Sequence, residues 1–296
     1  MSIKRIRKPK RMLLVINPIA GRELGKKYAF GLISFFSREG YIVTARPTQE
    51  SAFENVEFIK NNARFYDIIV CCGGDGTLNE TISGLVKGKA ETPLGYIPLG
   101  TTNDFARTLE ISSSPFEAAL AITKGKIKKI DCGYFNGKNF AYIAATGAFT
   151  QASYGATPAE KRYLGSLAYM IKGVESLAKL KPFHLKAKAN DEIIEGDFLY
   201  ASVSNTTSLG GIFRLDPNKV KTDFEFVLIR SPNNISEKGK LVTGILTDSL
   251  NSEYVDLIYA PEIKIKLDEY MPWSLDGENG GEHKEIVIKN IAQKIN

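Results

Sequence analysis

An apolar run that leads directly into a glycine-rich turn is the feature that most constrains this fold. Residues 68–80 have the sequence IIVCCGGDGTLNE, in which three glycines surround one carboxylate, Asp75. Glycine has no Cβ atom, so such a turn can bring backbone N–H groups close to an anion, and a helix that starts there presents its positive end. A carboxylate among phosphate-binding amides requires a cation such as Mg²⁺ between them. The segment therefore predicts a strand, loop and helix that bind a nucleotide with its metal.

Short apolar runs alternate with amphipathic segments up to about residue 130. Strands are predicted at Met12–Ile16, Tyr41–Ala45, Ile68–Cys72 and Leu94–Ile97. After the glycine turn, apolar residues recur at the spacing of one helical face. A further helix is predicted to begin at Pro115, with Ser114 and Glu117 forming a capping box. This alternation indicates a parallel sheet with helices on both faces.

From Asp131 onward, turn signals and strand-like runs dominate. Asn136-Gly137 between apolar runs is a strong hairpin signal, and Asn190-Asp191 joins two more such runs. Strands are predicted at 183–187, 193–204, 220–229, 254–259 and 263–267, and helices at 159–179 and 236–249. We therefore predict an α/β nucleotide-binding domain at 1–131 and a β-rich, sandwich-like domain at 132–296, whose last residues are expected to pack back on the first domain.

Composition is compatible with a cytoplasmic enzyme. The 296 residues, 43% of them hydrophobic, are enough for about two domain cores. No apolar run approaches the ~18 residues that span a bilayer, and the apolar stretch after the basic N-terminus is too short for a signal peptide. The cysteines Cys71, Cys72 and Cys132 have neither disulfide nor zinc spacing, so we expect buried, inert thiols. The two histidines offer little to a Ser-His-Asp or metal site.

The net charge of +6 equals the charge carried by the first eleven residues. Two interpretations stay open: a solvated tail, or an arm that binds an anionic membrane, where each Lys or Arg contributes up to ~1 kcal/mol. Nucleic acid is disfavoured because no aromatic side chains are interleaved for base stacking. The basic residues are Lys4, Arg5, Arg7, Lys8, Lys10 and Arg11.

Loops after two other predicted strands carry polar residues, and ligands bind outside the carboxyl ends of parallel strands. Asn17-Pro18 follows the first strand, and the segment from Gly21 to Lys27 falls one residue short of a P-loop, with Lys27 in place of the Ser or Thr that holds Mg²⁺. We therefore exclude a P-loop NTPase. In the other loop, Thr101 and Asn103 are expected to hydrogen-bond ribose or phosphate, and Asp104 to cap the next helix.

The string GGDGTLNE, followed one βα unit later by Gly100-Thr101-Thr102-Asn103-Asp104-Phe105-Ala106-Arg107, resembles the diacylglycerol kinase catalytic-domain family. That family includes bacterial lipid kinases and sphingosine kinases and is distantly similar to NAD kinases. Thr102 departs from a glycine found in many relatives. The resemblance implies an NAD-kinase-like first domain, a β-rich second domain and an active site in the cleft between them. It implies that ATP is bound by Asn17, Pro18, Gly21, Thr48, Gly73, Gly74, Asp75, Gly76, Thr77, Asn79, Glu80, Thr101 and Asn103.

The same resemblance suggests further metal and catalytic residues. Asp75 and Asp131 would organise the metal and its waters. A structural Mg²⁺ would be bound by the Asp223 side chain and by the backbone carbonyls of Val220 and Glu225, although Phe224 stands where relatives have glycine. Near the C-terminus, Asp276-Gly277-Glu278 resembles the family's D-G-E element. This match makes Glu278 the general base, with Asp276 holding either Glu278 or a metal-bound water.

The function predicted from these motifs is an ATP-dependent, Mg²⁺-requiring lipid kinase that phosphorylates diacylglycerol to phosphatidic acid. The alternatives are a kinase of another lipid, such as a sphingoid base or polyprenol, NAD kinase, and a nucleotide-sensing regulator without turnover. Expected partners are a lipid substrate at the membrane surface and, through the basic N-terminus, an anionic membrane. The sequence leaves a homodimer open.

Overall fold

The computed structural model describes residues 9–101, 103–127, 129–147, 181–204, 208–209, 213–214, 223–232, 234, 237, 240–241, 254–276 and 278–295. The chain forms two compact units. One takes in the chain up to Ile130 together with Gln293–Asn296, and the other extends from Asp131 to Ala292. In the part of the chain that is described, every helix is too short or too polar to cross a bilayer.

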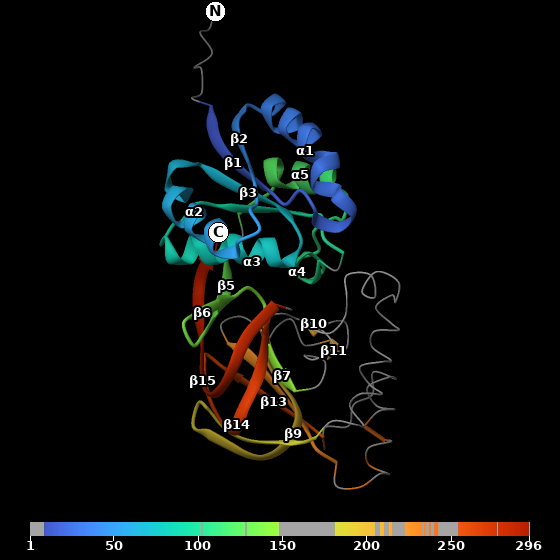
Figure 1. Cartoon of the computed structure of the whole chain (residues 1–296), viewed down its shortest axis with the longest axis vertical. Coiled ribbons are helices and arrows are strands. Elements are labelled where there is room, and N and C mark those ends of the chain that lie inside the picture. The colour runs from blue at the N-terminus through green and yellow to red at the C-terminus, as the bar shows by residue number, and fades with distance from the viewer. Residues whose placement is uncertain are drawn as a thin grey trace, which may run out of the picture. The chain divides into compact units, whose positions relative to one another are not determined.

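The first unit is built on a parallel sheet of four strands in the order β2-β1-β3-β4 (Figure 1). Its strands are β1 (Lys10–Ile16), β2 (Tyr41–Pro47), β3 (Ile68–Gly73) and β4 (Leu94–Pro98). Met12 lies opposite Val43 on one side and Ile68 on the other, and β1 is buried from Met12 to Ile16. A strand that is paired on both edges and covered on both faces needs such a continuous apolar run. The four predicted strands are confirmed.

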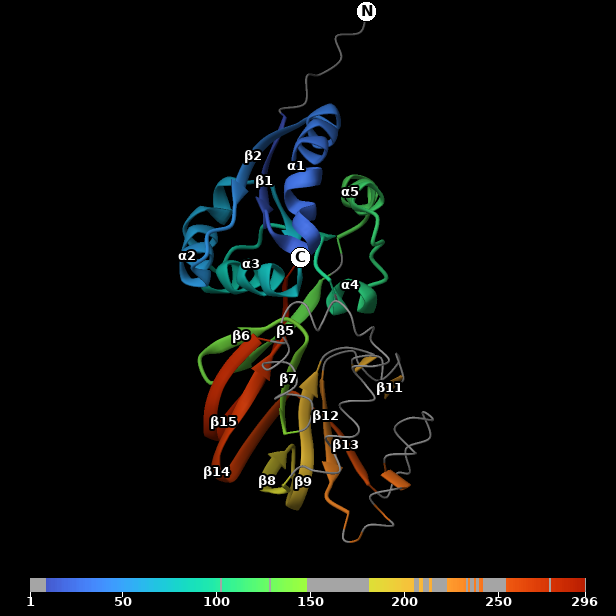
Figure 2. The same ribbon diagram turned by 45° about the vertical axis from the view of Figure 1, so that its right-hand side comes forward.

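Helices cover both faces of this sheet. They are α1 (Ala20–Arg38), α2 (Ala52–Asn62), the 3₁₀ turn η1 (Ala63–Phe65), α3 (Asp75–Lys87), α4 (Asp104–Thr108) and α5 (Pro115–Lys124). Figure 2 shows α1 and α5 on one side of the sheet and α2 and α3 on the other. On the first side, Leu32 and Phe36 of α1 share a core with Met12 and Leu14 of β1 and with Ala118 of α5. The predicted α/β arrangement is confirmed.

Two predicted helix caps are wrong. Helix α5 does begin at Pro115, but the Ser114 side chain makes no cap hydrogen bond in the described structure. The carboxylate of Glu117 instead accepts a hydrogen bond from Ser112 Oγ at 2.6 Å, and Ser112 Oγ accepts the Ser114 N–H. The Ser112 hydroxyl has therefore taken the place of the capping box. Asp104 is the first residue of α4 rather than its cap, because Asn103 occupies that place in a left-handed conformation.

The second unit is dominated by a sheet of nine described strands. Its order is β13-β12-β9-β7-β14-β15-β5-β6, and β8 pairs with β14 and β9. The strands are β5 (Ile130–Phe135), β6 (Lys138–Phe140), β7 (Ile143–Gly147), β8 (Phe183–Ala189), β9 (Glu192–Ser204), β12 (Phe224–Arg230), β13 (Val255–Ala260), β14 (Glu262–Leu275) and β15 (Glu278–Ile295). A separate small pair joins β10 (Ser208–Leu209) and β11 (Phe213–Arg214).

Both predicted hairpins are present in the second unit. Asn136 and Gly137 connect β5 and β6 with φ angles of 42° and 91°, and Asn190 lies in the β8–β9 turn with φ of 55°. Strand β14 is much longer than predicted. Its pairing with β15 shifts register between Lys266 and Met271, and the polar residues there interrupt the apolar alternation from which a strand is predicted. The predicted helix at 159–179, most of that at 236–249 and the first residues of the strand at 220–229 lie outside the described residues.

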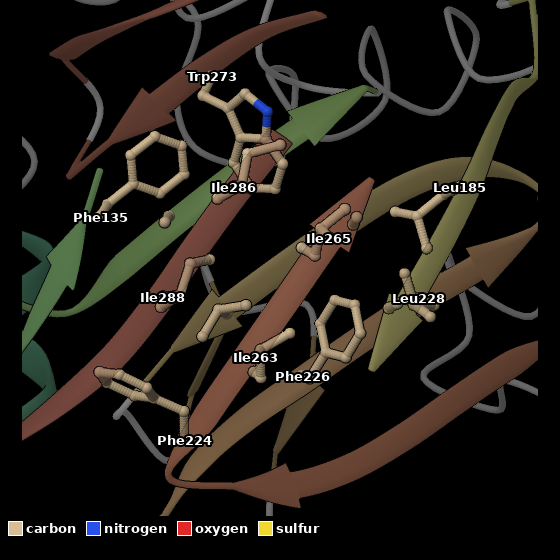
Figure 3. Close-up of a cluster of buried hydrophobic side chains, with 14 of the residues drawn as sticks. Phe135, Leu185, Phe224, Phe226, Leu228, Ile263, Ile265, Trp273, Ile286 and Ile288 are labelled. Atoms are coloured by element: carbon tan, nitrogen blue, oxygen red, sulfur yellow. The ribbon is translucent and has the colours of Figure 1, made fainter. Parts of the chain in front are cut away.

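Buried apolar side chains from the strands of this sheet pack into one core (Figure 3). Phe135 and Trp273 pack with ring centroids 5.1 Å apart, and Phe140 stacks on Phe224 at 5.5 Å. Trp273 is buried three residues before Asp276. The core therefore fixes the end of β14, where the turn to β15 begins.

Candidate nucleotide site and the Asp276 turn

The glycine turn lies at the carboxyl end of β3, next to the loop that follows β4. A Cβ atom added to Gly100 would lie 2.5 Å from the Cα atom of Gly74, so the two backbones approach too closely for side chains. Helix α3 begins directly at Asp75. The first N–H groups of a helix are not bonded within the helix and can bind an anion. In α3 these groups lie at the glycine turn.

Asn17 ties the end of β1 to this turn. Its Nδ2 donates to Thr77 Oγ1 at 3.0 Å, and its Oδ1 accepts the Ile19 N–H at 3.1 Å. The strand order reverses between β1 and β3, because the chain passes from β1 to β2 on one side and then to β3 on the other. Ligands bind at such a switch point in open α/β sheets. The structure therefore brings the predicted residues Asn17 and Thr77 together where a nucleotide is expected.

Gly21 allows the chain to turn sharply after β1. Its φ is 59°, and a Cβ atom there would lie 2.5 Å from the carbonyl oxygen of Leu99, at the end of β4. Pro18 lies between Asn17 and exposed Ile19 at the same edge. Both residues shape the loop backbone, and a direct contact of either with ATP stays a prediction.

Asn103 is engaged within its own loop. Its Oδ1 accepts hydrogen bonds from the Gly100 N–H at 2.9 Å and Tyr96 Oη at 3.3 Å, and its Nδ2 donates to the Gly100 carbonyl. Asn103 thus shapes the loop that presents Thr101, which is exposed. Tyr96, which also lies 3.3 Å from the Gly73 carbonyl, was not singled out from the sequence because a tyrosine inside an apolar strand resembles ordinary core.

The carboxylate of Asp75 reaches across to the next loop. Its Oδ1 accepts the N–H of Phe105, in the first turn of α4, at 3.3 Å. Asp75 is only partly buried, so it can also face a ligand. Among the described residues no group of three or more His, Cys, Asp or Glu side chains forms a metal cage. A single carboxylate beside phosphate-binding amides nevertheless suits Mg²⁺, which proteins commonly hold with one or two carboxylates and substrate phosphates.

Asn55, which was not predicted as a site residue, links Glu80 to the loop that contains Thr48. Thr48 follows β2, and its N–H donates to the Ile16 carbonyl at 2.8 Å. The Asn55 side chain bonds both backbone groups of Gln49 and the carboxylate of Glu80. The signal was available, because Asn55 falls on the apolar face of α2 beside buried Val56 and Ile59. Buried polar groups need partners.

Asn79 lies one residue before Glu80 and accepts a hydrogen bond from Ser83.

The cysteines take no part in this chemistry. Burial raises the pKa of the Cys71 thiol to about 12 and that of Cys72 well above its ordinary value. Cys132 is also buried. The expectation of buried thiols is confirmed, and the raised pKa values of Cys71 and Cys72 keep these two thiols protonated at neutral pH, which makes them poor nucleophiles.

In the second unit, Asp276 holds a turn rather than facing solvent. Its Oδ2 accepts the Ala141 N–H at 2.5 Å, and its Oδ1 accepts those of Tyr142 and Ile143 at 2.9 and 3.0 Å. The Asp276 N–H donates in return to the Ile143 carbonyl. This carboxylate, 3% exposed, thereby fixes the β14–β15 turn to the segment before β7. The structure thus shows the Asp276 carboxylate fixing this turn, whereas its expected role of holding Glu278 or a metal-bound water stays a prediction.

The structure describes some of the other predicted residues one by one. Asp131 accepts a hydrogen bond from Asn290 Nδ2 of β15 at 2.9 Å. Glu225 lies inside β12, opposite Ser204 on one side and Tyr259 on the other. Hydrogen bonds between the strands therefore compete with a metal ion for its backbone carbonyl. Asp223 is half-buried just before β12. Val220 and Gly277 lie outside the described residues, as does the side chain of Glu278. The roles of these residues stay predictions.

Known proteins are similar to this chain in sequence and in fold. A model of the diacylglycerol kinase catalytic domain matches residues 11–135. A diacylglycerol kinase of Bacillus subtilis is 34% identical over 92% of this chain and 91% of its own length, and one of Staphylococcus carnosus is 30% identical over 97% and 94%. The chain belongs to the diacylglycerol kinase family. It is a lipid kinase, as the sequence motifs predicted.

Solved structures confirm the fold. A diacylglycerol kinase from Bacillus anthracis has a TM-score of 0.74 at 22% identity, covering 97% of this chain and 96% of that one. A second structure from the same organism has a TM-score of 0.82 at 24% identity, covering 100% and 97%. The combination of an α/β part with a β-rich part is therefore that of known diacylglycerol kinases.

Proposed function

We propose that this enzyme transfers the γ-phosphate of ATP to the hydroxyl of diacylglycerol, giving phosphatidic acid. The observation that carries the proposal is the joining of three strand-end loops around the glycine turn. Asn17 bonds Thr77, and Asp75 bonds the N–H of Phe105, so loops after β1, β3 and β4 form one assembly at the switch point. Anion-binding amides at this place suit a nucleotide triphosphate. Family membership supports diacylglycerol over NAD as the acceptor.

In the proposed reaction, the glycine turn and the start of α3 bind the phosphates. Asp75 would hold Mg²⁺, which supplies charge neutralisation on the phosphates when bound. Glu278 would accept the proton of the lipid hydroxyl as that oxygen bonds to the γ-phosphorus and the bond from this phosphorus to ADP breaks, while Asp276 would keep the turn before Glu278 in position. Most of the acceleration in such reactions comes from alignment and electrostatic stabilisation, which pre-formed loops provide.

The experiment is a transfer assay with γ-labelled ATP and Mg²⁺. Purified enzyme is incubated with mixed micelles that contain diacylglycerol, a sphingoid base or a polyprenol, and separately with NAD. Label should enter the organic phase with diacylglycerol as the best acceptor. Label that appears in NADP and in none of the lipids would refute the proposal, and a preference for another lipid would revise the acceptor.

We also propose that the enzyme works in the cytoplasm, held peripherally at anionic membranes by basic residues at its N-terminus. The structure refines the test of this idea. Lys10 and Arg11 belong to β1, paired with Tyr41 and Ile42, so their removal would damage the sheet. Deletion of residues 2–8 removes four basic residues and spares the strand. It should weaken sedimentation with anionic vesicles at low salt, and the wild-type advantage should fade as salt screens the charges. Equal sedimentation at low salt would refute the proposal.

A further inference from the structure

Asn55 is a buried amide near the N-terminus of α2, where the helix surface that packs into the core begins. It is 4% exposed, between the exposed N-terminal turn of α2 and buried Val56 and Ile59. An asparagine at such a position costs stability unless every polar atom is bonded. The Asn55 side chain therefore needs specific hydrogen-bond partners.

Those partners match an asparagine side chain atom by atom. Nδ2 donates to the Gln49 carbonyl at 2.9 Å and to Glu80 Oε2 at 2.9 Å, while Oδ1 accepts the Gln49 N–H at 2.8 Å. The set requires two N–H donors and an acceptor on one short side chain. An aspartate has no donors, and an alanine has neither donors nor acceptor.

These bonds connect two segments at the ligand edge of the sheet. Gln49 belongs to the loop after β2, which is anchored to β1 by the Thr48 N–H and the Ile16 carbonyl. Glu80 belongs to α3, which begins within the glycine turn. The strand order is β2-β1-β3-β4, and the phosphate-binding turn follows β3. The loop after β2 therefore lies on the side of this turn that is opposite to β4.

We propose that Asn55 is a positioning residue for the nucleotide. It fixes residues 48–51 against Glu80, so that this loop forms a wall for the nucleoside end of ATP while the phosphates occupy the glycine turn. The inference rests on the proposed use of ATP at this site. The hydrogen bonds described for the Asn55 side chain go to Gln49 and Glu80, so its loss should weaken nucleotide binding and leave phosphoryl transfer largely intact.

The test compares the KM for ATP with kcat in Asn55→Asp. This variant keeps an acceptor for the Gln49 N–H, loses both donors and places a carboxylate against Glu80. The KM for ATP should rise about tenfold or more, as expected when uniform binding is lost, with kcat within about threefold of wild type. Asn62→Asp is the matched control: it makes the same change on the same helix, where Asn62 donates only to the Phe58 carbonyl among the described groups. Its KM should stay within about twofold.

A double-mutant cycle isolates the link to Glu80. In Asn55→Asp with Glu80→Gln, the glutamine can donate to the aspartate, so the KM penalty of Asn55→Asp should be several-fold smaller than in the Glu80 background. Asn55→Ala, which buries no charge, repeats the KM measurement if Asn55→Asp melts too early to assay.

An unchanged KM for ATP, or a collapse of kcat at constant KM, would overturn the positioning role. Failure of both variants to fold would also overturn it, because Asn55 would then serve the fold as a whole. A wild-type enzyme that transfers no phosphate from ATP would instead refute the proposed function. The two failures are therefore distinguishable.

Discussion

Replacing Asp276 by asparagine tests whether one buried carboxylate holds the turn that carries Glu278. Asparagine has the same shape, and it tolerates the left-handed backbone of this residue, where φ is 52°. The change therefore leaves packing and backbone nearly intact. It alters only what faces the three N–H groups of Ala141, Tyr142 and Ile143.

The expected loss follows from these bonds. An amide oxygen can keep two of the three N–H groups, but the amide NH₂ then faces the third N–H, so that one donor meets another. A hydrogen bond to a charged group contributes about 1.5–3 kcal/mol, and a buried unsatisfied donor costs about 1–3 kcal/mol. Allowing for overlap between these terms, Asp276→Asn should lower the free energy of unfolding by about 2–4 kcal/mol.

Trp273 provides the assay. It is the only tryptophan of the chain, and it lies buried in the core of the second unit three residues before the turn. Urea unfolding followed by its fluorescence should show the midpoint lowered by about 1 M at an unchanged m-value. Asp268→Asn, on the exposed part of the same strand, is the matched control and should shift the midpoint by less than about 0.3 M. A similarly small shift in Asp276→Asn would refute the idea that this carboxylate fixes the turn.

Three further predictions concern the carboxylates of both units. Asp75→Asn keeps an acceptor for the Phe105 N–H, so the melting temperature should stay close to wild type while kcat falls at least ~10²-fold; early melting with a normal rate would make Asp75 structural only. Glu278→Gln should lower kcat by ~10²–10⁴-fold at a nearly constant KM for ATP, and a variant that keeps most of its kcat would move the general base elsewhere. Burial raises the pKa of Glu225 to about 7 from 4.5, with Tyr259 Oη bonded to its carboxyl. The folded state then binds more protons than the unfolded state between those values, so wild type should lose stability as pH rises from about 5 to 7. In buffer with EDTA, Glu225→Gln should flatten this dependence and unfold at higher urea than wild type at pH 8; parallel pH profiles for the two proteins would contradict the shift.

The sequence was sufficient where local pattern and tertiary structure agree. Apolar runs bounded by turns predicted β1 and β3, and Asn136-Gly137 predicted its hairpin, because these features are encoded within a few neighbouring residues. The capping box at Ser114 failed because Ser112, two residues earlier, competes for Glu117. That competition depends on loop conformation, which spacing alone does not reveal.

The site was predicted less completely than the fold. Motif residues Asn17, Asp75 and Thr77 were named, and the structure brings them to one sheet edge. The hydrogen bonds of Asn55 and Asp276 were not foreseen, because each depends on partners from distant parts of the chain. Polar residues of this kind can be suspected from an apolar pattern that they interrupt, but their partners become visible only in three dimensions.

The position of β1 in the middle of its sheet has a consequence for biosynthesis. Asn17 at its end bonds Thr77, 60 residues further along the chain. As the polypeptide leaves the ribosome, the apolar segment Met12–Ile16 must therefore wait for β3 before it is covered on both edges. During this delay one edge of the strand stays open, which promotes aggregation, and the flanking charges of Lys10 and Arg11 oppose such association. Conditions that slow elongation between β1 and β3 should thus increase dependence on chaperones.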